Sequence, residues 1–125
     1  MVKVLIVDDE APILQSTAVI LRAYGFQTAT VSEARHILPT LEAERPDVLL
    51  QDVRMPGLAL RELLEGLRAG PHRDLPVVLF SASISLPDLV DAFDVDAVVE
   101  KPFRPEALVS ALRGAIEKRR PAEPA

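Results

Sequence analysis

The segment Val4-Leu5-Ile6-Val7-Asp8-Asp9-Glu10 joins an unbroken apolar run to a group of carboxylates. Three further apolar runs have the same character, with β-branched residues and no alternation with polar ones; they cover residues 48–50, 77–80 and 97–99. Such runs are typical of strands buried on both faces of a parallel sheet. A weaker strand is predicted at residues 27–31, where threonine and valine favour an extended chain.

Segments with helical spacing separate these strands. The first helix is expected to end at Tyr24 and Gly25, because glycine readily adopts the left-handed conformation that closes many helices. The second is expected to begin with Ser32 as its N-cap and to be kinked or shortened by Pro39, which cannot donate to the helical ladder. Further helices are predicted over residues 59–69, near 87–93 and over 105–119.

The alternation of strands and helices predicts a three-layer α/β fold with a doubly wound, five-stranded parallel sheet. The flavodoxin-like strand order 2-1-3-4-5 is the leading choice, and it places ligands outside the carboxyl ends of the first and third strands. We assign residues 1–120 to one such domain. Residues 121–125 consist of proline, alanine and glutamate and are interpreted as a disordered tail or the start of a linker.

Composition excludes several classes of protein. No run approaches the roughly twenty apolar residues that span a bilayer, and no secretory signal is present, so we expect a cytoplasmic protein without membrane contact. The absence of cysteine rules out thiolate metal sites. His36 and His72 are a weak zinc pair and are interpreted as surface residues. A net charge of -5 argues against direct nucleic acid binding by this domain.

Polar side chains stand where the predicted strands end. They are Asp8 and Asp9 after the first strand, Asp52 after the third, Ser81 after the fourth and Lys101 after the fifth. Carboxylates about 4 Å apart repel by roughly 4 kcal/mol per pair at an effective dielectric near 20, so the cluster needs a cation or a proton. Hard oxygen ligands open to water suit Mg²⁺, which often shares phosphate oxygens with a substrate. An aspartate can attack a phosphoryl group, and an ammonium and a hydroxyl beside it would neutralise the phosphoryl oxygens.

Four motifs in this sequence resemble those of the response-regulator receiver family of two-component phosphorelays, and the similarity covers nearly the whole chain. They are Val-Asp-Asp-Glu at 7–10, Asp-Val-Arg-Met-Pro-Gly at 52–57, Ser-Ala at 81–82 and Lys-Pro-Phe at 101–103.

This resemblance implies that Asp52 is the phosphoacceptor and that Ser81 and Lys101 contact the phosphoryl group. It also implies that Asp8, Asp9, Asp52 and the backbone carbonyl of Arg54 hold Mg²⁺. The donor would be a phosphohistidine on a sensor histidine kinase or a histidine phosphotransfer protein, and an unidentified downstream protein or output domain would respond. The domain would not be an enzyme beyond its own phosphotransfer and autodephosphorylation. The Lys101–Pro102 peptide bond is expected to be cis.

Each residue alone has an ordinary interpretation. Asp9 could cap a helix, Asp52 could be a turn residue, and Ser81 and Lys101 could be a satisfied hydroxyl and a solvated amine. Only their joint pattern favours phosphoryl chemistry, and the role of the Arg54 side chain stays open. Two alternatives remain: a pseudo-receiver that signals by binding alone, and a small phosphatase with an aspartyl-phosphate intermediate.

Three features depart from the family pattern. Ala59 and Leu60 replace the usual Asp-Gly step, and the segment between Ser81 and Lys101 is about two residues short. Val98 stands where the family commonly has tyrosine or phenylalanine, so we expect a modest change at the output face on phosphorylation. Because unbound carboxylates repel, we also expect Asp8→Asn to stabilise the metal-free domain.

Overall fold

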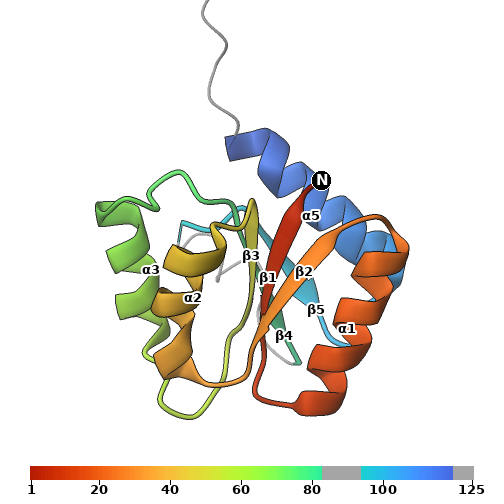
Figure 1. Ribbon diagram of the computed structural model, residues 1–125, viewed down its shortest axis with the longest axis horizontal. Helices are drawn as coiled ribbons and strands as arrows, with labels where there is room; N and C mark the ends of the chain where they lie inside the picture. Colours follow the sequence, from red (N-terminus) through yellow and green to blue (C-terminus); the bar gives the residue numbers. More distant parts are fainter. Residues whose placement is uncertain (83–93, 120–125) are drawn as a thin grey trace, which may run out of the picture.

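The computed structural model describes residues 1–82 and 94–119, which form a parallel sheet between two layers of helices (Figure 1). The strands are β1 (Lys3–Val7), β2 (Gln27–Val31), β3 (Val48–Asp52), β4 (Val77–Ser81) and β5 (Ala97–Glu100). The helices are α1 (Ala11–Ala23), α2 (Ile37–Glu44), α3 (Leu60–Ala69) and α5 (Pro105–Arg119). The strand order is β2-β1-β3-β4-β5, which confirms the predicted doubly wound fold. The helix expected near residues 87–93 and the tail at 121–125 lie outside the described residues.

The apolar strands divide their side chains between two cores, because neighbouring residues point to opposite faces of the sheet. In β1, Val4 and Ile6 pack with α1 and α5, whereas Leu5 and Val7 pack with α2 and α3. Figure 1 shows the same arrangement, with α1 and α5 on one face of the sheet and α2 and α3 on the other. Burial on both faces explains why these strands lack polar alternation.

Helix α1 ends as predicted. Its C-cap residue is Tyr24, and Gly25 follows with a φ of 92°, in the left-handed region that glycine occupies without steric cost. Helix α5 spans the predicted residues 105–119, and α3 begins one residue later than predicted.

The start of α2 differs from the prediction. Ser32 is not an N-cap: a 3-10 turn, η1 (Ala34–His36), comes first, and α2 begins at Ile37. Pro39 therefore lies in the first turn of α2, where its missing N–H would have had no helical acceptor. The proline is compatible with the start of this short helix instead of kinking its interior.

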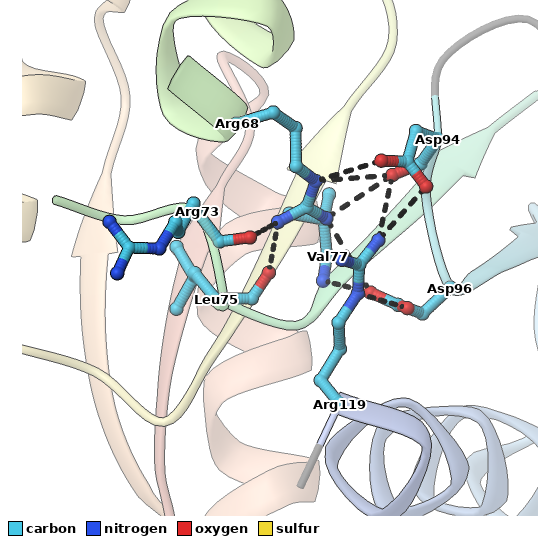
Figure 2. Close-up of polar contacts among 7 residues, drawn as sticks. All are labelled: Arg68, Arg73, Leu75, Val77, Asp94, Asp96 and Arg119. Atoms are coloured by element: carbon cyan, nitrogen blue, oxygen red, sulfur yellow. Dashed lines mark hydrogen bonds and ion pairs between the residues drawn. The ribbon is translucent and has the colours of Figure 1, made fainter. Parts of the chain in front are cut away.

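At the amino end of the sheet, Arg68 of α3 and Arg119 of α5 converge on Asp94 and Asp96 just before β5 (Figure 2). We call these four residues the amino-end clamp. The two oxygens of Asp96 accept hydrogen bonds from Arg119 Nε at 2.7 Å and from the Val77 backbone N–H at 2.9 Å. The Arg68 guanidinium donates to the Leu75 and Asp94 carbonyls at 2.8 and 3.2 Å. The clamp thus joins α3, α5 and the starts of β4 and β5.

Within the described ranges, no helix has the length and apolar character needed to cross a bilayer.

His36 is exposed and lies 3.4 Å from Glu33. His72 also lies at the surface, with its side chain 21% exposed, and hydrogen-bonds to Glu42 at 2.8 Å. The pair joins the end of α2 to the segment after α3.

Candidate phosphoacceptor site

The parallel register aligns the carboxyl ends of the central strands. Val7 pairs with Gln51 and Asp52 pairs with Phe80, so the residues that follow β1 stand beside the end of β3. Ligand oxygens of Asp8, Asp9 and Asp52 lie within 4.8 Å of one another. Asp8 is completely buried and Asp52 is 6% exposed, whereas Asp9 faces solvent. The structure therefore brings the three predicted carboxylates together, two of them inside the protein.

Lys101, which directly follows β5, bridges the two buried carboxylates. Its Nζ donates to Asp8 Oδ2 at 2.8 Å and lies 3.4 Å from Asp52 Oδ1. Its backbone N–H donates to the Ser81 carbonyl at 2.8 Å, and the Lys101–Pro102 peptide bond is cis, as predicted.

The expected stabilisation by Asp8→Asn did not include the Lys101 ammonium, because it counted only the repulsion between carboxylates. That substitution would remove an ion pair as well as a repulsion, so we no longer expect it to stabilise the domain.

The acidic pair does not cap α1. Glu10 occupies the N-cap position without a side-chain cap, and the Asp8 Oδ1 atom accepts the Glu10 backbone N–H at 2.8 Å. This bond and the Lys101 ammonium occupy both oxygens of Asp8. The ordinary interpretation of the pair as a helix cap is therefore wrong.

Burial raises the pKa of the Asp52 carboxyl to about 6, with a contribution from the nearby charge of Asp8. The Lys101 ammonium and the Arg54 backbone N–H oppose this rise. Burial on its own lowers the pKa of Lys101, but the hydrogen bond to Asp8 and the charge of Asp52 outweigh it and raise that pKa. One ammonium thus partly compensates two buried carboxylates.

A small pocket of about 180 Å³ opens onto Asp52 and Lys101. Its lining residues are Glu10, Asp52, Arg54, Ser81, Ala82 and Lys101. Ser81 is buried at the end of β4, and Arg54 is exposed at the rim with its N–H 3.4 Å from Asp52 Oδ1. The pocket joins the predicted nucleophile, hydroxyl and ammonium in one small polar space.

The donor set fits a hard divalent cation. Among the residues described, neither Asp52 Oδ2 nor the Asp9 carboxylate has a hydrogen-bond partner, whereas Asp8 is already paired. An ion of this kind is held by one or two carboxylates and keeps several waters, so a half-open site with spare carboxylate oxygens suits it.

Phe80 was not predicted to lie at the site, but its ring lies beneath the Lys101 ammonium, with 4.4 Å between the ring centroid and Nζ. Phe80 belongs to an apolar strand in which every residue is buried, so its type alone marks it only as core. Its position directly opposite Asp52 in the parallel register was the available signal.

A five-stranded parallel sheet with an acidic cluster and a lysine at the ends of its strands defines a receiver-like α/β domain. The profile of the response regulator receiver domain family matches residues 4–113. This chain belongs to that family, whose members are generally phosphoacceptor signalling domains of two-component systems and not enzymes.

Known proteins similar to this chain include the DNA-binding response regulator MtrA of Mycolicibacterium paratuberculosis, which is 31% identical over 118 residues. That alignment covers 93% of this chain and 52% of MtrA. The C4-dicarboxylate transport transcriptional regulatory protein DctD of Pseudomonas aeruginosa is 35% identical over 120 residues, or 94% of this chain and 26% of DctD. This chain thus spans about half of MtrA and about a quarter of DctD.

A CheY-like receiver domain protein from Methanospirillum hungatei has a similar crystal structure, with a TM-score of 0.82 and 26% sequence identity. The match covers 95% of this chain and 96% of that protein.

Proposed function

We propose that this domain accepts a phosphoryl group on Asp52 from a phosphohistidine donor in the presence of Mg²⁺. In this proposal Asp8, Asp9, Asp52 and the backbone carbonyl of Arg54 hold the ion. Ser81 and Lys101 contact the phosphoryl oxygens. The single observation that carries the proposal is the bridging of buried Asp8 and Asp52 by Lys101, beside the exposed carboxylate of Asp9.

The reaction follows from this arrangement. An Asp52 carboxylate oxygen forms a bond to phosphorus while the phosphorus–nitrogen bond of the phosphohistidine breaks, and the imidazole leaves with the electron pair. A bound Mg²⁺ would supply positive charge to the phosphoryl oxygens. Lys101 supplies a further positive charge and Ser81 a hydroxyl at the same pocket. Burial raises the pKa of Asp52 to about 6 even with Lys101 beside it, so a further cation at the pocket would favour the ionised, nucleophilic form of the carboxylate.

The donor's approach is suggested by a groove that adjoins the pocket. It is lined by Glu10, Ile13, Ser16, Thr17, Ile20, Ala82, Lys101, Pro102 and Phe103. The groove shares Glu10, Ala82 and Lys101 with the phosphoacceptor pocket, so a protein seated on α1 could present a histidine to Asp52. We propose that a sensor histidine kinase or histidine phosphotransfer protein docks there.

The rival functions have less support. A pseudo-receiver would not need the complete set of Asp8, Asp9, Asp52, Ser81 and Lys101. A phosphatase acting on external substrates would need a second acid two residues after Asp52, where this chain has Arg54. We further propose that residues 1–120 act as the receiver unit, without direct nucleic acid contact, and signal to a downstream protein or an output domain.

The direct test is intact-mass measurement after incubation with Mg²⁺ and a small acyl phosphate. The wild-type protein should gain one phosphoryl group, and Asp52→Asn should gain none. Asp47→Asn is the matched control, because Asp47 precedes the opposite end of the same strand and is exposed. Phosphoryl mass on Asp52→Asn, or none on the wild type, would refute the assignment.

A further inference from the structure

We propose that Phe80 is a positioning residue for phosphoryl transfer, because its ring is an aromatic platform that holds the Lys101 ammonium beside Asp52. This inference rests on the proposed function and adds a residue to it. Among the described residues, three contacts surround the ammonium: Asp8 Oδ2 at 2.8 Å, Asp52 Oδ1 at 3.4 Å and the centroid of the Phe80 ring at 4.4 Å.

The contact is of the kind that stabilises a cation. A cation within about 6 Å of the centroid of an aromatic face is attracted by the ring quadrupole, and the attraction grows when both groups are removed from water. Phe80 is fully buried, and the Lys101 side chain is 13% exposed. An aliphatic side chain of similar size would fill the same core position without this attraction.

The fold leaves little freedom to the ring. Phe80 packs in the core on the α1 and α5 side of the sheet together with Val99 and Leu108. Its backbone carbonyl accepts the Val53 N–H at 3.2 Å, and its Cα is paired in register with that of Asp52. Phe80 is therefore held on β4, directly beside Asp52 on β3, and the pairing of these two strands sets the distance between them.

The Phe80 ring attracts the Lys101 ammonium without fixing the direction of its N–H groups, as a carboxylate acceptor would. A lysine ammonium carries three N–H donors, and each conventional acceptor fixes the direction of one of them. The aromatic face attracts the charge without such a directional demand, so Lys101 can exchange its contact with Asp8 for a phosphoryl oxygen while the ring contact persists. We infer that Phe80 lowers the cost of this exchange of partners.

The experiment replaces Phe80 alone with mono-, di- and trifluorinated phenylalanine, which keeps the shape of the ring while weakening its attraction for cations. The rate of Mg²⁺-dependent phosphorylation by a small acyl phosphate is then measured by intact mass at several donor concentrations. In this reaction the Asp52 oxygen bonds to phosphorus, and the acyl carboxylate leaves with the electron pair.

The maximal rate should fall step by step with fluorine number, by at least about threefold for the trifluorinated ring, while the donor KM stays unchanged. Phe80→Leu should lower the maximal rate about tenfold, which corresponds to about 1.4 kcal/mol in the barrier. A merely structural role would not produce a graded response to fluorine.

Phe26 is the matched control. It is buried in the same core, and its ring faces the Arg113 guanidinium at 5.6 Å, but it precedes β2 at the opposite end of the sheet. The same fluorinated residues and Phe26→Leu should leave the rate unchanged. Equal rates for all ring variants of Phe80 would overturn the platform while leaving phosphorylation of Asp52 intact. A wild-type protein that gains no phosphoryl group would overturn both proposals.

Discussion

Both ends of the sheet hold buried acidic side chains beside cations, Asp96 at the amino end and Asp8 and Asp52 at the carboxyl end, but the two ends satisfy these carboxylates differently. In the amino-end clamp, Arg68 and Arg119 donate to several carbonyl and carboxylate oxygens, and both Asp96 oxygens accept hydrogen bonds (Figure 2). At the carboxyl end, Asp8 and Asp52 share one ammonium, and burial raises the pKa of Asp52.

This difference separates a structural charge cluster from a functional one. A buried ion pair contributes to stability only when hydrogen bonds satisfy its remaining atoms, which is the condition of the clamp. Unsatisfied charge lowers stability, and it is tolerated where a ligand can supply the missing partner. The carboxyl end has such unsatisfied oxygens, and a metal ion and a phosphoryl group would complete them.

The largest effect is expected from breaking the clamp. Asp96→Ala should lower the free energy of unfolding by about 3 kcal/mol, because Arg119 Nε and the Val77 N–H lose their acceptor and Arg68 loses an ion-pair partner. Urea denaturation measures the loss. Asp94→Asn is the control, because the Asp94 side chain is 73% exposed and asparagine tolerates its positive φ of 49°; it should cost less than about 1 kcal/mol. Equal losses of unfolding free energy for Asp96→Ala and Asp94→Asn would show that the buried carboxylate of the clamp stabilises the fold no more than the exposed one.

Removing the Asp52 charge at the carboxyl end of the sheet should instead raise the free energy of unfolding. In metal-free buffer, Asp52→Asn should stabilise the domain by roughly 2 to 3 kcal/mol at neutral pH, because the buried carboxylate with its pKa of about 6 is replaced by a neutral group.

The pH dependence follows from the same shift. Asp52 loses its proton near pH 3.8 in the unfolded chain and near pH 6 in the folded protein. Its contribution to the free energy of unfolding therefore falls as the pH rises between these values and levels off above them. The stability difference between Asp52→Asn and wild type should therefore grow from about pH 4 to pH 6. A difference that is constant over this range in urea titrations would show that Asp52 is not destabilised by burial.

A smaller effect is expected from the metal. Mg²⁺ at about five times its Kd should stabilise the wild-type domain by about 1 kcal/mol through mass action, and Asp9→Asn should lose most of this gain. Glu33→Gln is a suitable control, since Glu33 is an exposed acid outside the cluster. Thermal unfolding curves that coincide with and without millimolar Mg²⁺ would show that the carboxyl end does not take up the ion.

The smallest effect is expected at Val98, in the middle of β5 between the two ends. This side chain is partly buried against the α2 and α3 core, and its β-branched shape nearly fixes its χ1 angle. A phosphoryl mimic at Asp52 should therefore change amide chemical shifts strongly beside Asp52 and only modestly over residues 97–108. Shifts of equal size in both regions would show a full switch without an aromatic residue.

Much of this protein could be predicted from local sequence. The apolar runs indicated four of the described strands, because burial on both sheet faces requires unalternating apolar residues, and the threonine- and valine-rich segment indicated β2. Helical spacing indicated the four described helices. The clustering of Asp8, Asp9, Asp52 and Lys101 was also predictable, since parallel strands bring their carboxyl ends together. The start of α2 was not, because a serine N-cap signal at Ser32 competes with a proline that suits a later first turn.

Pairings between distant side chains depended on the tertiary structure. The sequence by itself determined the parallel sheet and the residues at its carboxyl end, through periodicity and chain order, and it favoured the observed strand order. Only the packed chain decided that Lys101 would bridge Asp8 and Asp52, that Phe80 would lie beneath it, and that Arg68 and Arg119 would converge on Asp96. Such contacts join residues far apart in the chain, and their distances and burial fix how charge is compensated, which residue types alone do not specify.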